Sequence, residues 1–282
     1  MSISLLEHRF GLARDMVRNE GDRLVRAVVS TPRSEYAKVE NLEAHNITGP
    51  AHAARAVQQH DRLKSVLATA GCDLIDVPEL FRHPNSVFTR DAVLCTPEGY
   101  IELRMGLPSR RGEERWMANV LDSAGEPCLG AITAPGTVEG GDIILAGSVA
   151  FIGRSGRTNG EGVRQISGLL ERLGYEVRSA KVPEPYLHLG GAMSMLGPDR
   201  VLCCCGVFSG TWFEGFATVK VPSGSFASGN VICLGENEVI ADRTNQESVD
   251  RMQRVGITVY TVDLSEFLKG TGGPSCLIMP LE

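Results

Sequence analysis

The strongest constraint on the fold is a pattern of strands and turns that recurs along the chain. Four strand-like apolar segments end in proline, at 72–78, 128–135, 175–183 and 215–222, and a fifth without the proline lies at 256–264. Their ends are about 40 to 57 residues apart. Repeats of this length form architectures in which each unit buries its apolar face against its neighbours. The pattern therefore predicts an array of similar units.

Each unit combines a pair of strands, a helix and a final strand. Hairpin-like pairs of apolar runs around turn residues occur at 87–106, 140–153, 192–205 and 229–241. Helix-like stretches precede most of the final strands, at 53–71, 161–174 and 245–256. In the second of these stretches, Val163, Ile166 and Leu170 follow the helical period, and Gly174 supplies a stop signal.

Five such units predict an α/β fold that closes into a ring. The expected units are 24–80, 85–135, 137–184, 187–225 and 227–282. The fourth is the weakest, because 208–215 carries no clear helical signal. The sequence contains no low-complexity segment and no linker, so we expect one domain over 1–282.

Composition argues against several classes of function. The chain has 28 Lys and Arg against 34 Asp and Glu, a formal charge of −6, and no basic run that could neutralise phosphates. No stretch approaches the roughly 18 to 20 apolar residues that span a bilayer. Charges run through the first 23 residues, without the apolar core of a secretory signal. We expect a cytoplasmic protein with neither a nucleic-acid nor a membrane partner.

Eight cysteines invite a metal or disulfide interpretation, which their spacing does not support. None forms the C-x-x-C pair typical of zinc sites. A reducing cytoplasm would not maintain disulfides. The run VLCCCGVF (201–208) predicts a buried strand in which cysteine acts as a small hydrophobic residue. We therefore expect no metal site and a packing role for seven cysteines, with Cys276 as the exception.

Polar side chains recur where the strand pairs begin. They are Asp91 in NSVFTRDAV, Glu139 and Asp142 in TVEGGDIIL, His188 in YLHLGGAM, and Cys276 in GGPSCLIMP. In a ring of repeats, equivalent strand starts point towards one centre. The sequence thus predicts that carboxylates, an imidazole and a thiol converge there.

Each of these residues also has a simpler interpretation. A single histidine among leucines is often a satisfied core residue. Asp91 beside Arg90 suits a surface ion pair, and Gly-Gly-Asp is common in turns. Recurrence at one phase of the repeat weakens these alternatives together.

Longer motifs carry a resemblance to a known family. They are PNSVFTRD (84–91), GLPSRRGEE (106–114), APGTVEGGDI (134–143), IGRSGRTNGEG (152–162), LHL (187–189) and DLSEF with GGPSCLIM (263–279). In this order they resemble the guanidine-modifying enzymes of the pentein fold, including dimethylarginine dimethylaminohydrolase and arginine deiminase. The resemblance implies a five-bladed α/β propeller. Non-catalytic proteins share that fold, so fold alone does not imply an enzyme.

The resemblance implies a role for each convergent residue. Asp91 and Glu139 would grip a planar guanidinium with charge-assisted hydrogen bonds. Cys276 would attack the guanidino carbon as a thiolate, favoured by the bound cation and by His188. His188 would protonate the leaving amine and then activate water for attack on the S-alkylthiouronium intermediate. No cofactor is implied.

Four further residues are implied to bind a substrate with an α-amino-acid end. Arg104 and Arg157 would hold the α-carboxylate, although solvated surface pairs are the simpler interpretation of arginines in general. Leu42 lies in a stretch that resembles a lid, and Asn230 resembles an asparagine near the active site.

Substrate choice stays open, because two residues depart from the dimethylargininase pattern. Asn85 and Arg90 replace its acidic residues and resemble arginine deiminase, whereas Gly190 after His188-Leu189 does not. The chain also lacks room for the inserted helical domain of classical deiminases. The main hypothesis is hydrolysis of an Nω-methylated arginine to citrulline and a methylamine. Hydrolysis of arginine, amidino transfer and a non-catalytic binding module are the alternatives, and a homodimer is among the open oligomeric states.

Overall fold

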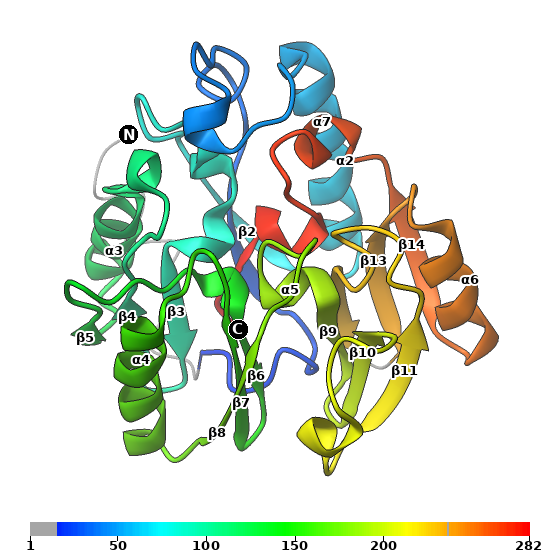
Figure 1. The fold of residues 1–282 in the computed structure, drawn as a ribbon. Coiled ribbons are helices and arrows are strands. Elements are labelled where there is room, and N and C mark those ends of the chain that lie inside the picture. Colours follow the sequence, from blue (N-terminus) through cyan, green and yellow to red (C-terminus); the bar gives the residue numbers. More distant parts are fainter. Residues whose placement is uncertain (1–15, 236) are drawn as a thin grey trace.

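The computed structural model describes residues 16–235 and 237–282. The first fifteen residues, over which the sequence argues against a secretory signal, lie outside the described residues, as does Glu236 in the predicted strand pair at 229–241. Five sheets of three strands each are arranged in a ring (Figure 1). Within the described ranges, no helix is long and apolar enough to cross a membrane.

The strands are distributed evenly over the five sheets. The first sheet holds β1 (Arg26–Ser30), β2 (Asp73–Val77) and β15 (Met279–Pro280), and the second holds β3 (Val93–Thr96), β4 (Gly99–Glu102) and β5 (Cys128–Ala131). The third holds β6 (Ile143–Ala146), β7 (Val149–Arg154) and β8 (Glu176–Lys181). The fourth holds β9 (Met193–Gly197), β10 (Arg200–Cys204) and β11 (Ala217–Val221), and the fifth holds β12 (Val231–Gly235), β13 (Glu238–Asp242) and β14 (Thr258–Val262).

Helices of two kinds connect these strands. The α-helices are α2 (Ala53–Thr69), α3 (Glu113–Ser123), α4 (Gly160–Arg172), α5 (Leu189–Ala192), α6 (Gln246–Arg254) and α7 (Ser265–Leu268). The short 3-10 helices are η1 (Glu43–His45), η2 (Pro84–Val87), η3 (Thr89–Asp91), η4 (Pro108–Arg110), η5 (Gly140–Asp142), η6 (Gly210–Phe213) and η7 (Pro274–Leu277).

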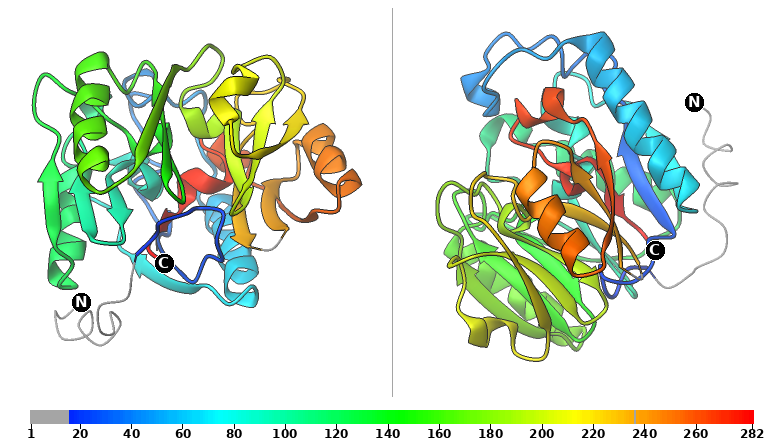
Figure 2. Two further views of the ribbon diagram at one scale, coloured as in Figure 1. Left: turned by 90° about the horizontal axis from the view of Figure 1, so that it is seen from below. Right: turned by 90° about the vertical axis from the view of Figure 1, so that its right-hand side faces the viewer.

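Every sheet repeats the same pairing. In the third sheet β6 pairs antiparallel with β7, and β7 pairs parallel with β8 after the crossover through α4. Nearly all residues of β6 and β7 are buried, whereas β8 alternates between exposed and half-buried residues. The two antiparallel strands of a sheet therefore lie inward, and the strand that pairs in parallel lies at the rim, which in the first sheet is β2. Figures 1 and 2 show α3, α4 and α6 on the outside of the ring.

The structure confirms the predicted five-bladed α/β architecture. The stretches predicted to be helical at 53–71, 161–174 and 245–256 contain α2, α4 and α6. The fourth crossover, where the helical signal is weak, holds only η6. Its Trp212 packs on Phe151 with ring centroids 4.9 Å apart, so aromatic side chains cover the third and fourth sheets at this position.

The C-terminal strand closes the ring on the first strand of the chain. β15 pairs antiparallel with β1, with Val28 opposite Met279, and Arg26 forms an ion pair of 3.1 Å with Glu282. The predicted fifth unit, 227–282, is therefore wrong at its end: its sheet ends at Val262, and the remaining segment returns to the first sheet. The reason is that the first unit supplies only two strands.

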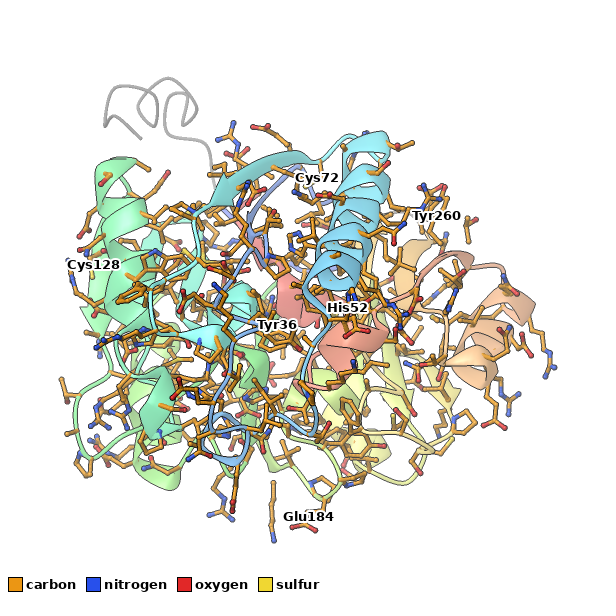
Figure 3. All side chains as sticks on the ribbon, turned by 90° about the horizontal axis from the view of Figure 1, so that it is seen from above. Tyr36, His52, Cys72, Cys128, Glu184 and Tyr260 are labelled. Carbon is orange, nitrogen blue, oxygen red and sulfur yellow. The ribbon has the colours of Figure 1, made fainter. Side chains whose placement is uncertain are left out.

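The cysteines confirm only part of the packing prediction. All eight are free, and five are buried, including Cys203 and Cys204 in β10. The prediction is wrong for Cys128 and Cys205, which are exposed. Cys128 lies in the rim strand β5, at the outer edge of the molecule (Figure 3), and Cys205 follows the end of β10.

Ring closure can be tested through Met279, which is 1% exposed. Met279→Ala leaves a cavity between β15 and the core and should lower the free energy of unfolding by about 2 to 5 kcal/mol. Urea unfolding measures this loss. Val255→Ala, at a side chain that is 50% exposed, is the matched control and should change it by no more than about 0.5 kcal/mol. Equal losses would contradict a closing role for β15.

Candidate active site

In each sheet, the edge strand of the antiparallel pair begins near the middle of the ring, and a polar residue precedes it; in the first sheet this strand is β15. Asp91 ends η3 before β3, Glu139 precedes η5 and β6, His188 precedes α5 and β9, Asn230 directly precedes β12, and Cys276 lies in η7 before β15. The segment that carries Cys276 crosses the centre of the molecule (Figure 1). The five sheets thus contribute five side chains from equivalent positions.

Glu139 is the most deeply buried of these groups, with no exposed surface. Its Oε2 lies 2.7 Å from Nε2 of His188, and its Oε1 accepts two backbone N–H groups from the 106–107 turn. Nη1 of Arg157 lies 3.3 Å from both oxygens. Burial alone would raise the pKa of Glu139, but the hydrogen bond and charge of His188, with Arg110 and Arg157, hold it well below its usual value. Glu139 is therefore an anion at neutral pH.

His188 is held as an imidazolium by the carboxylates around it. Burial lowers its pKa, but the charges of Asp91 and Asp142 and the hydrogen bond to Glu139 outweigh burial and raise it to about 9. Asp142 also accepts the backbone N–H of Leu189 at 2.9 Å, which fixes the backbone next to the imidazole. At neutral pH His188 can thus donate a proton.

Asp91 is buried and both of its oxygens have partners. Oδ1 accepts the N–H of Gly141 at 2.9 Å, and Oδ2 pairs with Nη1 of Arg110 at 2.6 Å. A Cβ on Gly141 would lie 2.9 Å from this Oδ1 and 2.8 Å from Nδ1 of His188. A larger residue at 141 would clash with both side chains, so only glycine allows Asp91 and His188 to lie next to each other at this point.

Arg110, which is 2% exposed, is a site residue that the sequence motifs did not indicate. Its Nε and Nη2 donate to Oε2 of Glu113 at 2.9 and 2.7 Å, and Nη2 also donates to the carbonyl of Phe88. Burial raises the pKa of Glu113 to about 7 in spite of this pairing. The available signal was the Arg-x-x-Glu spacing in PSRRGEE, which places both side chains on one side of a turn.

Cys276 is half-buried and is held from one side by Asn230. Nδ2 of Asn230 lies 3.8 Å from Sγ and also donates to Oγ of Ser275, whose N–H returns a bond to Oδ1. Burial raises the pKa of the Cys276 thiol to about 11, the charge of Asp91 adds to the effect, and Arg90 and Arg110 offset part of it. The resting nucleophile candidate is therefore a thiol.

Two cavities reach Cys276 and His188. A small one of about 10 Å³ is also lined by Asp91, Arg110 and Arg157. A larger one of about 300 Å³ is lined instead by residues 16–24, Arg90 and Asn230. The small cavity is the candidate substrate site, because the carboxylate of Asp91 and two arginines line it.

The structure separates the four predicted substrate-binding residues. Arg157 lines the small cavity, whereas Arg104 donates to the carbonyl of Gly136 at 2.9 Å and lines neither of the two cavities. Asn230 holds the Cys276 segment from the side of the larger cavity.

The predicted lid lies against the same site. Leu42 precedes η1 and packs on the core cluster that Cys276 also contacts. Asn46, which ends η1, lines the small cavity. Ser109 donates to the carbonyl of Ala44 at 2.6 Å, which ties this loop to the turn that carries Arg110. The 42–46 loop thus borders the small cavity through Asn46.

Three side chains have the spacing of metal ligands. One ligand atom each from Asp91, Glu139 and His188 lies within 4.8 Å of the others. Arg110, however, lies 2.6 Å from Asp91 and 3.8 Å from Glu139. A carboxylate cluster that already faces fixed guanidinium groups suits an organic guanidinium better than a metal ion.

The sequence of the chain is similar to a known family and to a curated protein of that family. A family model described as "N,N dimethylarginine dimethylhydrolase, eukaryotic" matches residues 35–282. The N(G),N(G)-dimethylarginine dimethylaminohydrolase of Pseudomonas aeruginosa is 34% identical over 239 residues, which cover 85% of this chain and 93% of the relative. The chain belongs to this family.

A solved structure of the same Pseudomonas aeruginosa enzyme and a relative of lower identity are also similar to the chain. The solved structure of a cysteine-to-serine mutant of the Pseudomonas aeruginosa enzyme with citrulline superimposes with a TM-score of 0.80 at 30% identity, over 92% of this chain and 99% of that one. The arginine deiminase of Listeria welshimeri is 24% identical over 70% of this chain and 61% of its own length. The chain is a hydrolase of the pentein superfamily that acts on C–N bonds of linear amidines.

The raised pKa of His188 predicts how stability depends on pH. A histidine with a folded pKa of about 9 and an unfolded pKa of 6.5 stabilises the fold fully below pH 6.5, and this contribution is lost as pH rises to 9. The free energy of unfolding lost in His188→Gln should therefore be largest near pH 6 and shrink towards pH 9. Urea unfolding across this range measures it.

His60 is the matched control, because burial lowers its pKa to about 4. A neutral buried histidine stabilises the fold above pH 6.5, and this contribution is lost as pH falls to 4. The loss in His60→Gln should therefore stay constant between pH 7 and 9. A loss at His188 that is equally flat would contradict the imidazolium assignment.

Proposed function

We propose that the chain hydrolyses the guanidino carbon of an Nω-methylated arginine to citrulline and a methylamine, through a covalent bond to Cys276. The observation that carries the proposal is that Asp91, His188 and Cys276, from three different sheets, line one cavity together with Arg157. The solved relative with bound citrulline, the ureido product of such a reaction, supports it.

The charges of the cavity fit an arginine-like substrate. The guanidinium would lie against Asp91 and Glu139, where forked N–H donors meet carboxylate oxygens. The remaining donors of Arg157 suit the α-carboxylate. Oδ1 of Asn85 is buried, lines this cavity and has no hydrogen-bond partner among the described residues, so it can accept a bond from the α-ammonium group.

Substrate entry requires an opening movement. A cavity of about 10 Å³ has room for about one water molecule. The 42–46 loop borders it through Asn46, and the loop is held by the packing of Leu42 and by hydrogen bonds such as that of Asn85 to the carbonyl of His45. We infer that this loop opens to admit substrate and closes over it.

The reaction proceeds in two halves. The arriving guanidinium stabilises the thiolate of Cys276, whose proton passes to water because His188 already carries its own, and the sulfur attacks the guanidino carbon. His188, an imidazolium at rest, donates its proton to the leaving methylamine as the C–N bond breaks. The neutral imidazole then takes a proton from water, whose oxygen attacks the same carbon. The C–S bond breaks as the hydroxyl proton of the adduct passes to the sulfur, so citrulline is released and the Cys276 thiol is restored.

Plain arginine is the second candidate substrate. Asn85 and Arg90 in PNSVFTRD favour it, because both resemble the deiminase pattern, and arginine deiminases are among the relatives. The two candidates differ in the leaving group, methylamine or ammonia, and the same side chains would serve both.

A substrate panel with a nucleophile variant tests the proposal. Purified protein should release citrulline from asymmetric dimethylarginine, and agmatine should be a poor substrate because it lacks the α-carboxylate. Cys276→Ser should reduce kcat at least about 1000-fold while thermal unfolding is unchanged, because a hydroxyl of far higher pKa replaces the thiol. Turnover of arginine alone would establish the second candidate. Wild-type rates in Cys276→Ser would refute the covalent mechanism.

Two arginine variants test the carboxylate site. Arg157→Ala should raise KM for the amino-acid substrate on the order of tenfold or more, because it removes a buried cation from the cavity. Arg104→Ala is the matched control and should leave KM nearly unchanged, since Arg104 binds a backbone carbonyl elsewhere. If Arg104→Ala raised KM and Arg157→Ala did not, Arg104 would be the residue that binds the α-carboxylate.

A further inference from the structure

The segment 16–24 lies across the end of the ring opposite the 42–46 loop (Figures 1 and 2). Glu20 is fixed there through its backbone and its side chain. Its N–H donates to the carbonyl of Leu145 at 2.8 Å, and its Oε1 accepts the N–H of Leu145 at 3.0 Å. The carboxylate is therefore held in place by β6.

Arg90 reaches this carboxylate from the centre of the ring. It is 8% exposed, and its Nη2 pairs with Oε1 of Glu20 at 2.7 Å and donates to the carbonyl of Ile143 at 2.6 Å. Its Nε donates to the carbonyl of Gly140 at 3.4 Å. The guanidinium thus joins η3, which carries Asp91, to the turn that follows Glu139.

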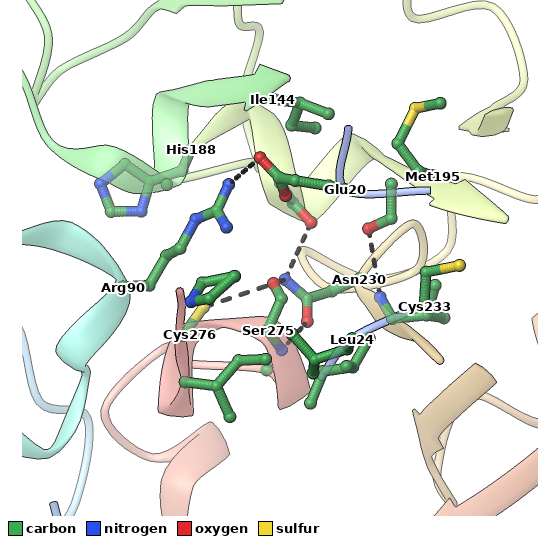
Figure 4. A pocket seen from close by; sticks show the side chains of 18 of the residues that line it. Glu20, Leu24, Arg90, Ile144, His188, Met195, Asn230, Cys233, Ser275 and Cys276 are labelled. Atoms are coloured by element: carbon green, nitrogen blue, oxygen red, sulfur yellow. Dashed lines mark hydrogen bonds and ion pairs between the residues drawn. The ribbon is translucent and has the colours of Figure 1, made fainter. Parts of the chain in front are cut away.

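Consecutive residues therefore place opposite charges on two sides of the nucleophile. Asp91 lines the small cavity with Cys276, and Arg90 lines the larger cavity with Cys276. Figure 4 shows the Arg90 guanidinium between His188 and Glu20, with Cys276 nearby on the side of Asn230 and Ser275. The Arg90 side chain is largely buried, so water screens its charge only in part.

We propose that Arg90 is a positioning residue whose guanidinium places a positive charge beside Cys276, on the side of the larger cavity. The carboxylate of Glu20, in the 16–24 segment, would offset part of this charge. The ion pair would set how readily the thiol becomes a thiolate before substrate arrives. This inference rests on the proposed function, in which Cys276 is the nucleophile. The charge of Arg90 favours a lower pKa of Cys276 against burial and Asp91, in agreement with this role.

The other charged groups around Cys276 are unchanged in the test. On the side of the small cavity they are Asp91, Arg110, Arg157 and His188. Around the larger cavity they are Arg18, Asp22, Arg23 and Glu282, besides the proposed pair. Any change in the variants below can therefore be assigned to the pair itself.

The test is the pH dependence of Cys276 alkylation by iodoacetamide, followed by mass spectrometry of the peptide that contains Cys276. Peptide resolution is needed because Cys128 and Cys205 are exposed. Glu20→Gln keeps the hydrogen bonds but removes the opposing charge, so the alkylation midpoint should fall. Arg90→Gln removes the cation, so the midpoint should rise. We expect shifts of about half a pH unit or more, which is at least about threefold in rate at a fixed pH below the midpoint.

Opposite shifts are the decisive feature, because a purely structural role would move both variants in the same direction. The double variant should have an alkylation midpoint close to that of the wild type. Arg90→Lys keeps the positive charge, so its midpoint should also stay close to the wild-type value. Shifts of the same sign, or none, would overturn the proposal. Should Arg90→Gln fail to fold, Glu20→Gln alone decides: a lower midpoint supports the proposal, and an unchanged or higher one refutes it.

The same experiment separates this inference from the proposed function. Alkylation needs no turnover, so opposite shifts without citrulline release would leave the ion-pair role standing and refute the activity. Citrulline release without opposite shifts would refute the ion-pair role and leave the proposed activity standing.

Discussion

The pairing of β15 with β1 is the contact on which the rest of the structure depends. It joins the C-terminal segment of the chain to β1 and so completes the first sheet with its third strand. The segment that leads into β15 carries Cys276 across the centre. Closure of the ring and placement of the nucleophile candidate are therefore one structural event, because the same few residues do both.

The closed ring buries several charged side chains at its centre, and these charges must be paired with opposite charges. Glu139 is completely buried, and Asp91 and Glu113 are almost so, yet each faces a cation: His188, Arg157 or Arg110. Burial of ions is costly unless they are paired and hydrogen-bonded. The arrangement is consistent with a site that must accept a cationic substrate, since fixed carboxylates replace the water that the substrate loses.

The sequence indicated most of the architecture because the signals were local. Apolar runs, turn residues and the helical period of 161–174 correspond to β-strands, hairpins and α4. Recurrence at the strand starts indicated Asp91, Glu139, His188 and Cys276, which the structure brings together. Asn230 completes the set as the fifth such position, although the sequence suggested substrate contact and the structure shows it against Cys276.

What the sequence could not indicate depended on contacts across the ring. Arg104 and Arg110 lie six positions apart and look alike in sequence, yet only Arg110 turns inward, because Glu113 and Asp91 hold it there. The exposure of Cys128 depends on which strand forms the rim. Sequence alone determined the repeat, the residue types and the chemistry open to them. Tertiary structure decided which side chains meet, because ring closure and buried charge pairing act between residues far apart in the chain.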